Sequence, residues 1–258
     1  MAIITLTTDL GTKDFYLAAI KGAIHTELPG VDLIDISNHI SRFNVAQAAF
    51  VLRNSFKFFP KKTVHVAGVD CSYEPRPRYL AVAWEGHYFV GPDNGLLSLM
   101  MNTEPVKIVE IENFEASALF HFPLKDILVK AACYLAAGNT MDALGKQTAN
   151  MKVKTSLYPV RDMDSLRGTV IYIDDYQNAV TNINHQLFEE TGRGRRFQIS
   201  FRKDEVLGRL DKNYNDVPEG EIVCLFGFSG FLEIAMNKST AASLLGLKLD
   251  EVVQIDFF

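Results

Sequence analysis

The feature that most constrains the fold is a change of pattern near residue 150. Before it, short β-branched strands alternate with segments of helical periodicity. After it, strands follow one another and are separated by Gly, Asn and Asp turns. Alternating strands and helices are typical of an α/β layer with a mainly parallel sheet, whereas closely spaced strands favour a sandwich or barrel. We therefore predict an α/β domain over residues 1–155 and an all-β, barrel-like domain over 164–258, joined by a linker within 146–166.

The individual elements follow from apolar periodicity and from helix-breaking residues. Pro29, Pro60 and Gly138 are expected to end the three helices of the first domain. Its predicted strands are 3–8, 31–36, 63–69, 79–84 and 88–91, and its predicted helices are 15–27, 44–59 and 124–137. The second domain is expected to contain strands at 168–173, 196–202, 221–226 and 251–257, with one short helix around 239–245.

Composition argues against several classes of protein. The 258 residues include 26 Lys and Arg against 31 Asp and Glu, and a net charge of −5 offers no basic surface to a nucleic acid. No apolar run approaches the roughly 20 residues of a membrane helix, and the N-terminus lacks the basic segment of a signal peptide. The three cysteines and six histidines lack disulfide-framework or metal-site spacing, so we expect no metal and a cytoplasmic protein.

Two acidic residues follow predicted parallel strands. Asp9 comes after the first strand and Asp70 after the third, and ligands of open α/β sheets bind beyond these strand ends. Asp9 can accept hydrogen bonds from a vicinal diol such as ribose, although an Asp that caps a loop is commoner. Arg76 and Arg78 follow Asp70 and can return to pair with it, but a surface ion pair of little energetic value is the alternative.

Three further segments carry polar or aromatic groups, and each also has a structural interpretation. Phe122 precedes the predicted helix 124–137, where it can stack on a base or pack against the first turn. Asp174 and Asn178 lie across a tight turn, where they can hold an amino acid or simply form the turn. Glycines on both sides of Ser229 permit close approach of a ligand, or a bend in a barrel strand.

The order of these segments resembles the S-adenosylmethionine (SAM) hydroxide adenosyltransferase family, which is related to fluorinases and chlorinases. The resemblance begins near Ile4 and extends to the C-terminus. It rests on TLTTDLGTKDFYLAAIKGAI, ISRFNVAQAAF, Val-Asp at 69–70, FVGPDNGLLS, VIYIDDYQNAVTNI and GFLEIAMNKSTAASLLG. The resemblance implies an α/β domain, a β-barrel domain, and a trimer that binds its nucleoside ligand between subunits. It also implies attack of water on C5′ of SAM, giving adenosine and methionine without a separate cofactor.

The same resemblance implies roles for single residues. Asp9 is similar to the family's ribose-binding Asp, and Asp174 and Asn178 are similar to the groups that hold the methionine end. The other substrate-binding residues that it implies are Phe43, Tyr73, Phe122, Ser229, Phe231 and Glu233.

The catalytic positions match the family less closely. Its hydrolases use an Asp, an Arg and a His, and Asp70 corresponds to the Asp that the halogenases lack, which argues against a halide nucleophile. Pro77 and Pro123 stand where the Arg and the His belong. The replacements expected from neighbouring positions are Arg76, Arg78 and His121. Three hypotheses follow: a divergent hydrolase, which we favour, a protein that binds SAM or adenosine without turnover, or a transferase with another nucleophile.

Overall fold

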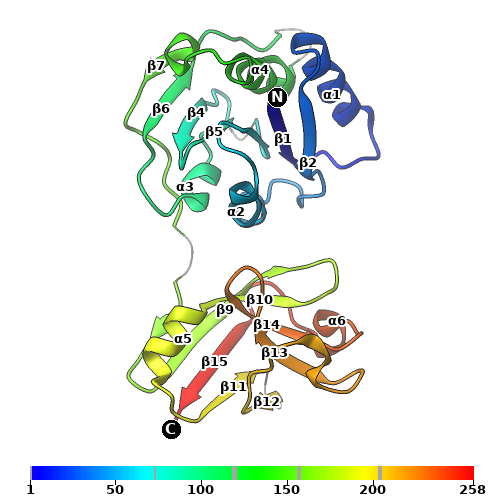
Figure 1. Ribbon diagram of the computed structural model, residues 1–258, viewed down its shortest axis with the longest axis vertical. Helices are drawn as coiled ribbons and strands as arrows, with labels where there is room; N and C mark the ends of the chain where they lie inside the picture. The colour runs from blue at the N-terminus through cyan, green and yellow to red at the C-terminus, as the bar shows by residue number, and fades with distance from the viewer. Residues whose placement is uncertain (1, 73, 118–120, 156–157, 203–204) are drawn as a thin grey trace. The chain divides into compact units, whose positions relative to one another are not determined.

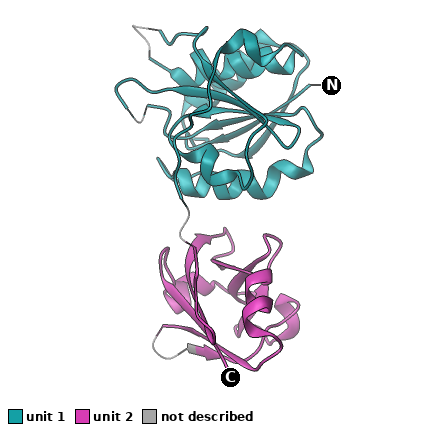
Figure 2. Ribbon diagram, turned by 90° about the vertical axis from the view of Figure 1, so that its left-hand side faces the viewer, with its two compact units in different colours: residues 1–156 teal, residues 157–258 magenta. Residues whose placement is uncertain are grey.

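The chain forms two compact units, residues 1–156 and 157–258 (Figure 2). The structure, a computed structural model, describes residues 2–72, 74–117, 121–155, 158–202 and 205–258. Within these ranges, no helix has both the length and the apolar character needed to cross a membrane.

A seven-stranded sheet with the order β2-β1-β3-β5-β4-β6-β7 forms the centre of the first unit. Its strands are β1 (Ile3–Thr8), β2 (Asp32–Ser37), β3 (Val64–Gly68), β4 (Tyr79–Trp84), β5 (His87–Pro92), β6 (Lys107–Ile111) and β7 (Gly145–Gln147). The neighbours from β2 to β5 are parallel, and the remaining neighbours are antiparallel. The sheet is therefore mixed, and not mainly parallel as predicted. The two-residue turn Glu85-Gly86, with positive φ at both residues, makes β4 and β5 an antiparallel hairpin.

Helices cover both faces of this sheet (Figure 1). One face packs against α1 (Phe15–Glu27) and against a continuous helix made of the π-helical segment η2 (Leu124–Val129) and α4 (Lys130–Ala136). The other face packs against α2 (Val45–Ser55) and α3 (Leu96–Met100). The short helices η1 (Phe56–Phe58) and η3 (Met141–Leu144) complete the unit.

The three helices predicted for the first unit are present, and their ends agree with the sequence signals, but the short helix α3 was not predicted. Helix α1 has the predicted bounds. Helix α2 begins after Asn44, whose side-chain oxygen accepts a hydrogen bond from Gln47 N at 2.9 Å, and the following 3₁₀ turn ends before Pro60. Because the buried residues of α2 lie on one side, at Val45, Ala48 and Leu52, the helix presents a single apolar face to the sheet.

The second unit is an antiparallel sheet of eight strands. Seven of them have the order β12-β11-β15-β9-β10-β14-β13, and β8 pairs with β9. The strands are β8 (Val160–Arg161), β9 (Ser165–Ile173), β10 (Ala179–Asn184), β11 (Phe197–Phe201), β12 (Glu205–Leu207), β13 (Ile222–Phe226), β14 (Phe231–Met236) and β15 (Val252–Phe257). After β12, Asp211 N donates to Cys224 O of β13 at 2.8 Å. The two ends of the sheet therefore meet, and the sheet is barrel-like and nearly closed.

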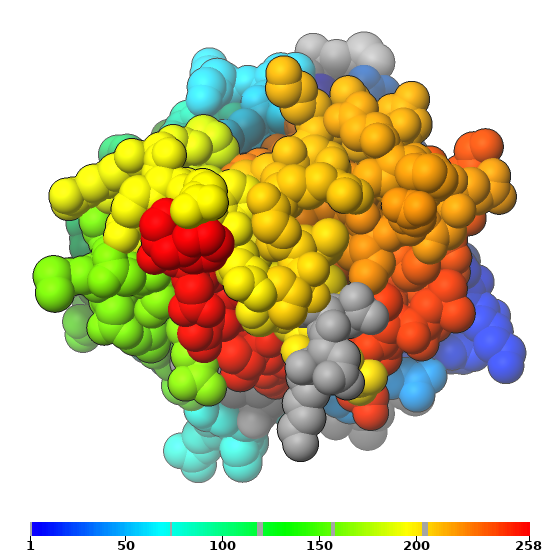
Figure 3. Space-filling view, turned by 90° about the horizontal axis from the view of Figure 1, so that it is seen from below, coloured from blue at the N-terminus to red at the C-terminus, as the bar shows by residue number. Residues whose placement is uncertain are grey.

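The prediction of one helix in the second unit is wrong, because α5 (His185–Gly192) precedes the expected helix α6 (Ala241–Leu245). Eight residues are too few for a clear helical periodicity, but Asn184 caps the helix by accepting from Leu187 N at 2.8 Å. Phe188 packs against Phe257 next to the C-terminus. In Figure 3 the C-terminal residues, in red, lie at the surface beside the yellow segment that follows α5. The 3₁₀ helix η4 (Tyr214–Asp216) lies between β12 and β13.

Gly145, the first residue of β7, gives a prediction about stability. Its φ is +155°, and a Cβ built on it would lie 2.1 Å from Glu110 O, a main-chain atom that cannot move aside. We expect Gly145→Ala to lower the free energy of unfolding by about 2 kcal/mol more than Gly138→Ala does. Gly138 is the control because it also has a positive φ, with nothing within 4 Å of an added Cβ. Urea unfolding followed by the fluorescence of Trp84 measures both variants, and equal losses would contradict the prediction.

Candidate functional site

The carboxyl ends of β1 and β3 bring Asp9 and Asp70 together. Thr8 lies opposite Gly68 in the parallel pairing of these strands, so the residues that follow them are neighbours. Asp70 N donates to Asp9 Oδ2 at 3.3 Å, and Phe43 N donates to the same oxygen at 3.0 Å. The Asp9 carboxylate therefore joins three loops at this edge, and the main chain of Asp70 is bonded to it.

The backbone around Asp70 is held in an uncommon conformation. Asp70 has φ +50° and Phe43 has φ +64°, in the left-handed region that a bulky residue such as Phe rarely adopts. Asn94 supports this geometry, because its buried Nδ2 donates to Val69 O at 3.0 Å and to Asp70 O at 3.3 Å. Such strained residues persist where the surrounding structure fixes them, and they cluster at active sites. The sequence around Asn94 predicts only a turn, and the hydrogen bonds of Asn94 to this loop become visible only in the tertiary structure.

The electrostatic surroundings of Asp70 are suited to a base. Its pKa lies above the ordinary value, chiefly because of burial and then because of the charge of Asp9, whereas Lys154 acts in the opposite direction. A carboxylate with a raised pKa accepts a proton more readily near neutral pH than a fully solvated one. The local arrangement can therefore remove a proton from a nucleophile placed beside it.

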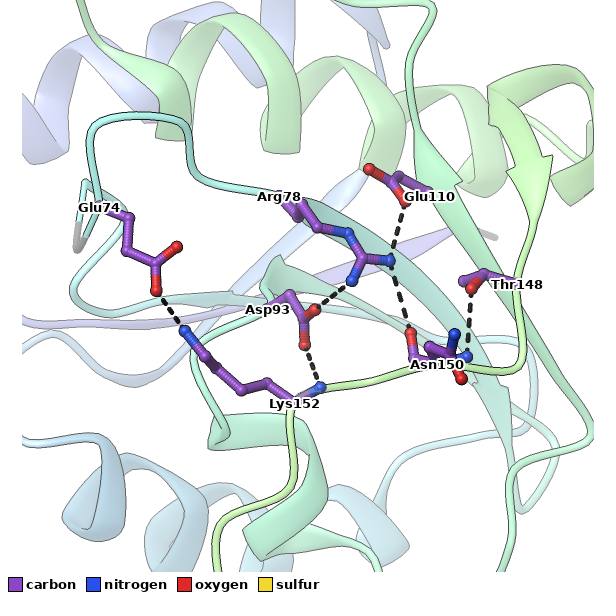
Figure 4. Close-up of polar contacts among 7 residues, drawn as sticks. All are labelled: Glu74, Arg78, Asp93, Glu110, Thr148, Asn150 and Lys152. Carbon is purple, nitrogen blue, oxygen red and sulfur yellow. Dashed lines mark hydrogen bonds and ion pairs between the residues drawn. The ribbon is translucent and has the colours of Figure 1, made fainter.

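Arg78 is held by other acids at the neighbouring edge of the sheet (Figure 4). Its Nη1 lies 3.0 Å from Asp93 Oδ2, and its Nη2 lies 2.8 Å from Glu110 Oε2 and 3.5 Å from Asn150 O. Asp93 is almost fully buried and also accepts from Lys152 N at 2.6 Å. These contacts tie together β4, β5, β6 and the segment after β7, so they give Arg78 a structural role.

The other residues proposed around Asp70 are less constrained. Arg76 and His121 are exposed, and no contact between either of them and Asp70 occurs in the described part of the chain. Tyr73 lies outside the described residues. Phe122 is half-buried, and its ring packs edge-on against Tyr16 with centroids 5.5 Å apart, as expected for an aromatic that covers the start of a helix.

In the second unit, Asp174 and Asn178 bind each other across the turn between β9 and β10. Asn178 N donates to Asp174 Oδ1 at 2.8 Å, and Asn178 Nδ2 donates to Asp174 Oδ2 at 3.0 Å. Asn178 is buried. These bonds fit the interpretation as a turn, and a ligand of this pair has to share the carboxylate with Asn178.

Glu233, on β14, is the centre of a second acidic group. Its Oε2 accepts from Tyr214 OH at 2.7 Å, and its carboxylate lies so close to Gly227 that any side chain there would collide with it. Burial raises the pKa of Glu233, the hydrogen bond from Tyr214 lowers it, and the charge of Asp174 raises it, with a net upward shift. Tyr214 carried no motif in the sequence, so only the structure reveals this contact.

Ser229 and Phe231 lie in the hairpin between β13 and β14. Ser229 Oγ accepts from Phe231 N at 3.4 Å, and Gly227 N donates to Phe231 O at 3.0 Å. The segment is thus a tight hairpin that carries Glu233 two residues later on β14.

A cavity of about 320 Å³ lies at the opposite edge of the first sheet, lined by residues that include Ile3, Thr63 and Leu135. None of the acidic residues described above lines this cavity. The candidate site is therefore assigned from its acidic side chains and not from the position of the cavity. In the described ranges, no group of three or more His, Cys, Asp or Glu side chains is arranged to hold a metal ion.

Comparisons with known proteins cover almost the whole chain. Residues 4–145 match the model of the SAM hydroxide adenosyltransferase N-terminal domain, and residues 168–254 match that of the C-terminal domain. The (R)-S-adenosyl-L-methionine hydrolase of Methanocaldococcus jannaschii is 29% identical over 97% of this chain and 94% of its own length. The enzyme of that name from Thermus thermophilus is 29% identical over 93% and 94%. The crystal structure of an uncharacterized conserved protein from Thermotoga maritima has a TM-score of 0.88 and 28% identity, covering 98% of this chain and 99% of that one.

Proposed function

Because the chain belongs to the SAM hydroxide adenosyltransferase family, we propose that it hydrolyses SAM to adenosine and methionine. The observation that carries the proposal is Asp70, whose main-chain N–H binds Asp9 at the carboxyl edge of the sheet and whose carboxyl group has a raised pKa. The hydrolase names of the relatives from Methanocaldococcus jannaschii and Thermus thermophilus support it.

In the proposed reaction, the oxygen of a water molecule attacks C5′ of SAM. The new C5′–O bond forms as the C5′–S bond breaks, and the bonding electron pair stays on sulfur, which changes from a sulfonium to the neutral thioether of methionine. Asp70 takes a proton from the attacking water. The leaving group is neutral, so no general acid and no separate cofactor is required. The site has to align the attacking water with the C5′–S bond and to keep other water molecules away from it.

We assign the ribose of SAM to Asp9. Its Oδ2 already accepts two main-chain N–H groups, whereas no described residue hydrogen-bonds to Oδ1. Oδ1 therefore has acceptor capacity for the ribose hydroxyls. Phe43 supports this assignment, because its nitrogen binds Asp9 and its side chain is 68% exposed, which leaves the ring free to pack on a nucleoside.

The remaining proposed residues have indirect support. The carboxylate of Asp174 suits the ammonium of the methionine part, and Phe122 and the segment with Ser229, Phe231 and Glu233 suit the nucleoside part. Tyr73 and Asn178 keep their proposed substrate contacts. Arg76 and His121 keep their proposed catalytic roles, whereas the ion pairs of Arg78 with Asp93 and Glu110 argue against the catalytic role predicted for it. We also propose a homotrimer with the ligand at the subunit interface, and a reducing cytoplasmic setting, which the three free thiols support.

The proposed function is tested by incubating the purified protein with SAM in water enriched in ¹⁸O. We expect adenosine and methionine in equal amounts, with ¹⁸O in the 5′ hydroxyl of adenosine, because water attacks C5′. A sample without protein corrects for spontaneous decay of SAM, and parallel samples with fluoride or chloride reveal a halide nucleophile. Intact SAM together with a ligand-induced rise in Tm would instead identify a binding protein, and a different 5′-substituted adenosine would identify another nucleophile.

A further inference from the structure

The edge that carries Asp70 has an excess of negative charge. Asp9 lies against it, and the neighbouring Cys71 thiol has a pKa raised by desolvation and by the charges of both acids. Desolvation and a like charge both favour the protonated form of a carboxyl group. A protonated Asp70 cannot accept a proton from water, so a positive charge near this edge would favour the form of Asp70 that the proposed hydrolysis uses.

Arg78 is the cation that the sequence suggests, but its guanidinium already faces two carboxylates. Asp93 and Glu110 lie 3.0 and 2.8 Å from its two terminal nitrogens. These two negative charges outweigh its single positive charge, so the net field of this group does not favour ionisation of Asp70.

Lys154, in the segment that follows β7, lies against the loop between β5 and α3, and Asn94 of that loop is bonded to the loop of Asp70. The Lys154 side chain lies directly on Gly95, where an added Cβ would be 2.5 Å from Lys154 Cγ and 2.6 Å from Cδ. The main-chain N–H of Lys154 donates to Ser98 Oγ at 3.0 Å, which fixes the backbone from which the side chain starts. Gly95 follows Asn94, the residue that holds the carbonyls of Val69 and Asp70. The glycine at position 95 thus leaves room for the lysine stem beside Asn94, which binds the loop that carries the proposed base.

The charge of Lys154 is also available to act on this loop. Among the described residues, the ammonium group of Lys154 makes no ion pair, because no carboxylate oxygen lies within 4.0 Å of it. Its charge lowers the pKa of Asp70, whereas burial and Asp9 raise it. Lys154 is therefore the cation that opposes the other two influences.

We propose that Lys154 is a positioning residue for the reaction: from its place on Gly95, its ammonium favours the ionised form of the Asp70 carboxylate, which accepts the proton of the attacking water. The inference rests on the proposed hydrolysis. Pro77 stands where the family's hydrolases have an Arg, and Lys154, outside the family motifs, supplies part of the positive charge of that Arg.

The test compares Lys154→Met, which keeps an unbranched apolar stem on Gly95, with Lys154→Arg, which keeps the charge. We expect the acidic limb of the pH profile of kcat/KM to move to higher pH in Lys154→Met, because the pKa of Asp70 rises. Activity in acid should fall roughly three- to tenfold and recover toward the wild-type value in alkali, and Lys154→Arg should restore the wild-type profile. An equal loss at every pH, or no loss, would overturn the proposal.

Lys152→Met is the matched control. Lys152 lies two residues away, and its ammonium pairs with Glu74 where both side chains are about half exposed. Such a surface pair contributes at most about 1 kcal/mol, so its loss should leave the pH profile in place.

A second measurement separates this proposal from the proposed function. The ¹³C shift of the Asp70 carboxyl carbon, followed by NMR as pH changes, reports the pKa without any turnover. Failure to hydrolyse SAM, with a pKa of Asp70 that rises in Lys154→Met, would refute the function alone. Hydrolysis with a pKa of Asp70 that is the same in both proteins would refute the role of Lys154 alone.

Discussion

Asp70→Asn should lower the rate of adenosine formation by about 10²- to 10⁴-fold, the range typical of a lost general base. The amide has the shape of the carboxylate but cannot accept the proton of water. The contacts that hold this loop use main-chain atoms of Asp70, namely its N–H to Asp9 and its carbonyl to Asn94, so they remain in the variant. Binding of SAM, measured by calorimetry, should therefore change much less than kcat.

Asparagine is a better test here than alanine. Asp70 has φ +50°, a conformation that Asn tolerates well and that strains Ala, so Asp70→Ala would mix a loss of chemistry with a loss of structure. Asp250→Asn is the matched control, because Asp250 has φ +66° in a turn of the second unit. We expect the control to keep wild-type turnover. Wild-type turnover in Asp70→Asn would remove Asp70 from the mechanism.

Acid should destabilise the first unit through a buried pair of histidines. His65 Nδ1 lies 2.7 Å from Thr5 Oγ1, and His65 Nε2 lies 3.2 Å from His87 Nδ1, in the fully buried centre of the sheet. Burial and then His87 lower the pKa of His65 to about 3, and burial and Lys61 lower that of His87. Both rings are therefore neutral in the folded chain at neutral pH.

The direction of the pH effect follows from this neutral state. An unfolded histidine binds a proton below about pH 6.5, whereas folded His65 does so only near pH 3, so stability falls as pH decreases between these values. At pH 4.5 the loss from His65 should be about 3 kcal/mol relative to pH 7. Urea unfolding at both pH values measures it, followed by the fluorescence of Trp84, the only tryptophan of the chain and part of the same unit.

The test variant is His65→Gln, which has no titrating ring. Its stability should depend less steeply on pH than that of the wild type, although it is less stable at pH 7. His39→Gln removes an exposed histidine of the same unit and should keep the wild-type dependence. If His65→Gln and the wild type lost equal stability between pH 7 and 4.5, the buried pair would not be the acid-sensitive element.

The sequence was sufficient to predict that Asp9 and Asp70 lie at the same edge of the sheet, because each directly follows a predicted strand and parallel strands end at one edge. The partners of Arg78 were not predictable in the same way. Glu110 lies on β6, a strand that the sequence pattern did not reveal, and the ion pair joins residues 32 positions apart. The packing of Lys154 on Gly95 likewise depends on tertiary structure, since neither residue has a local signal for it.

The raised pKa of the Cys71 thiol has a consequence for the durability of the proposed enzyme. SAM is an alkylating agent, and a thiolate is among the strongest nucleophiles that a protein offers. Desolvation and the charges of Asp9 and Asp70 keep this sulfur protonated at neutral pH, and a protonated thiol is a poor nucleophile. The acids at the proposed site of water attack thus also suppress alkylation of this thiol by SAM.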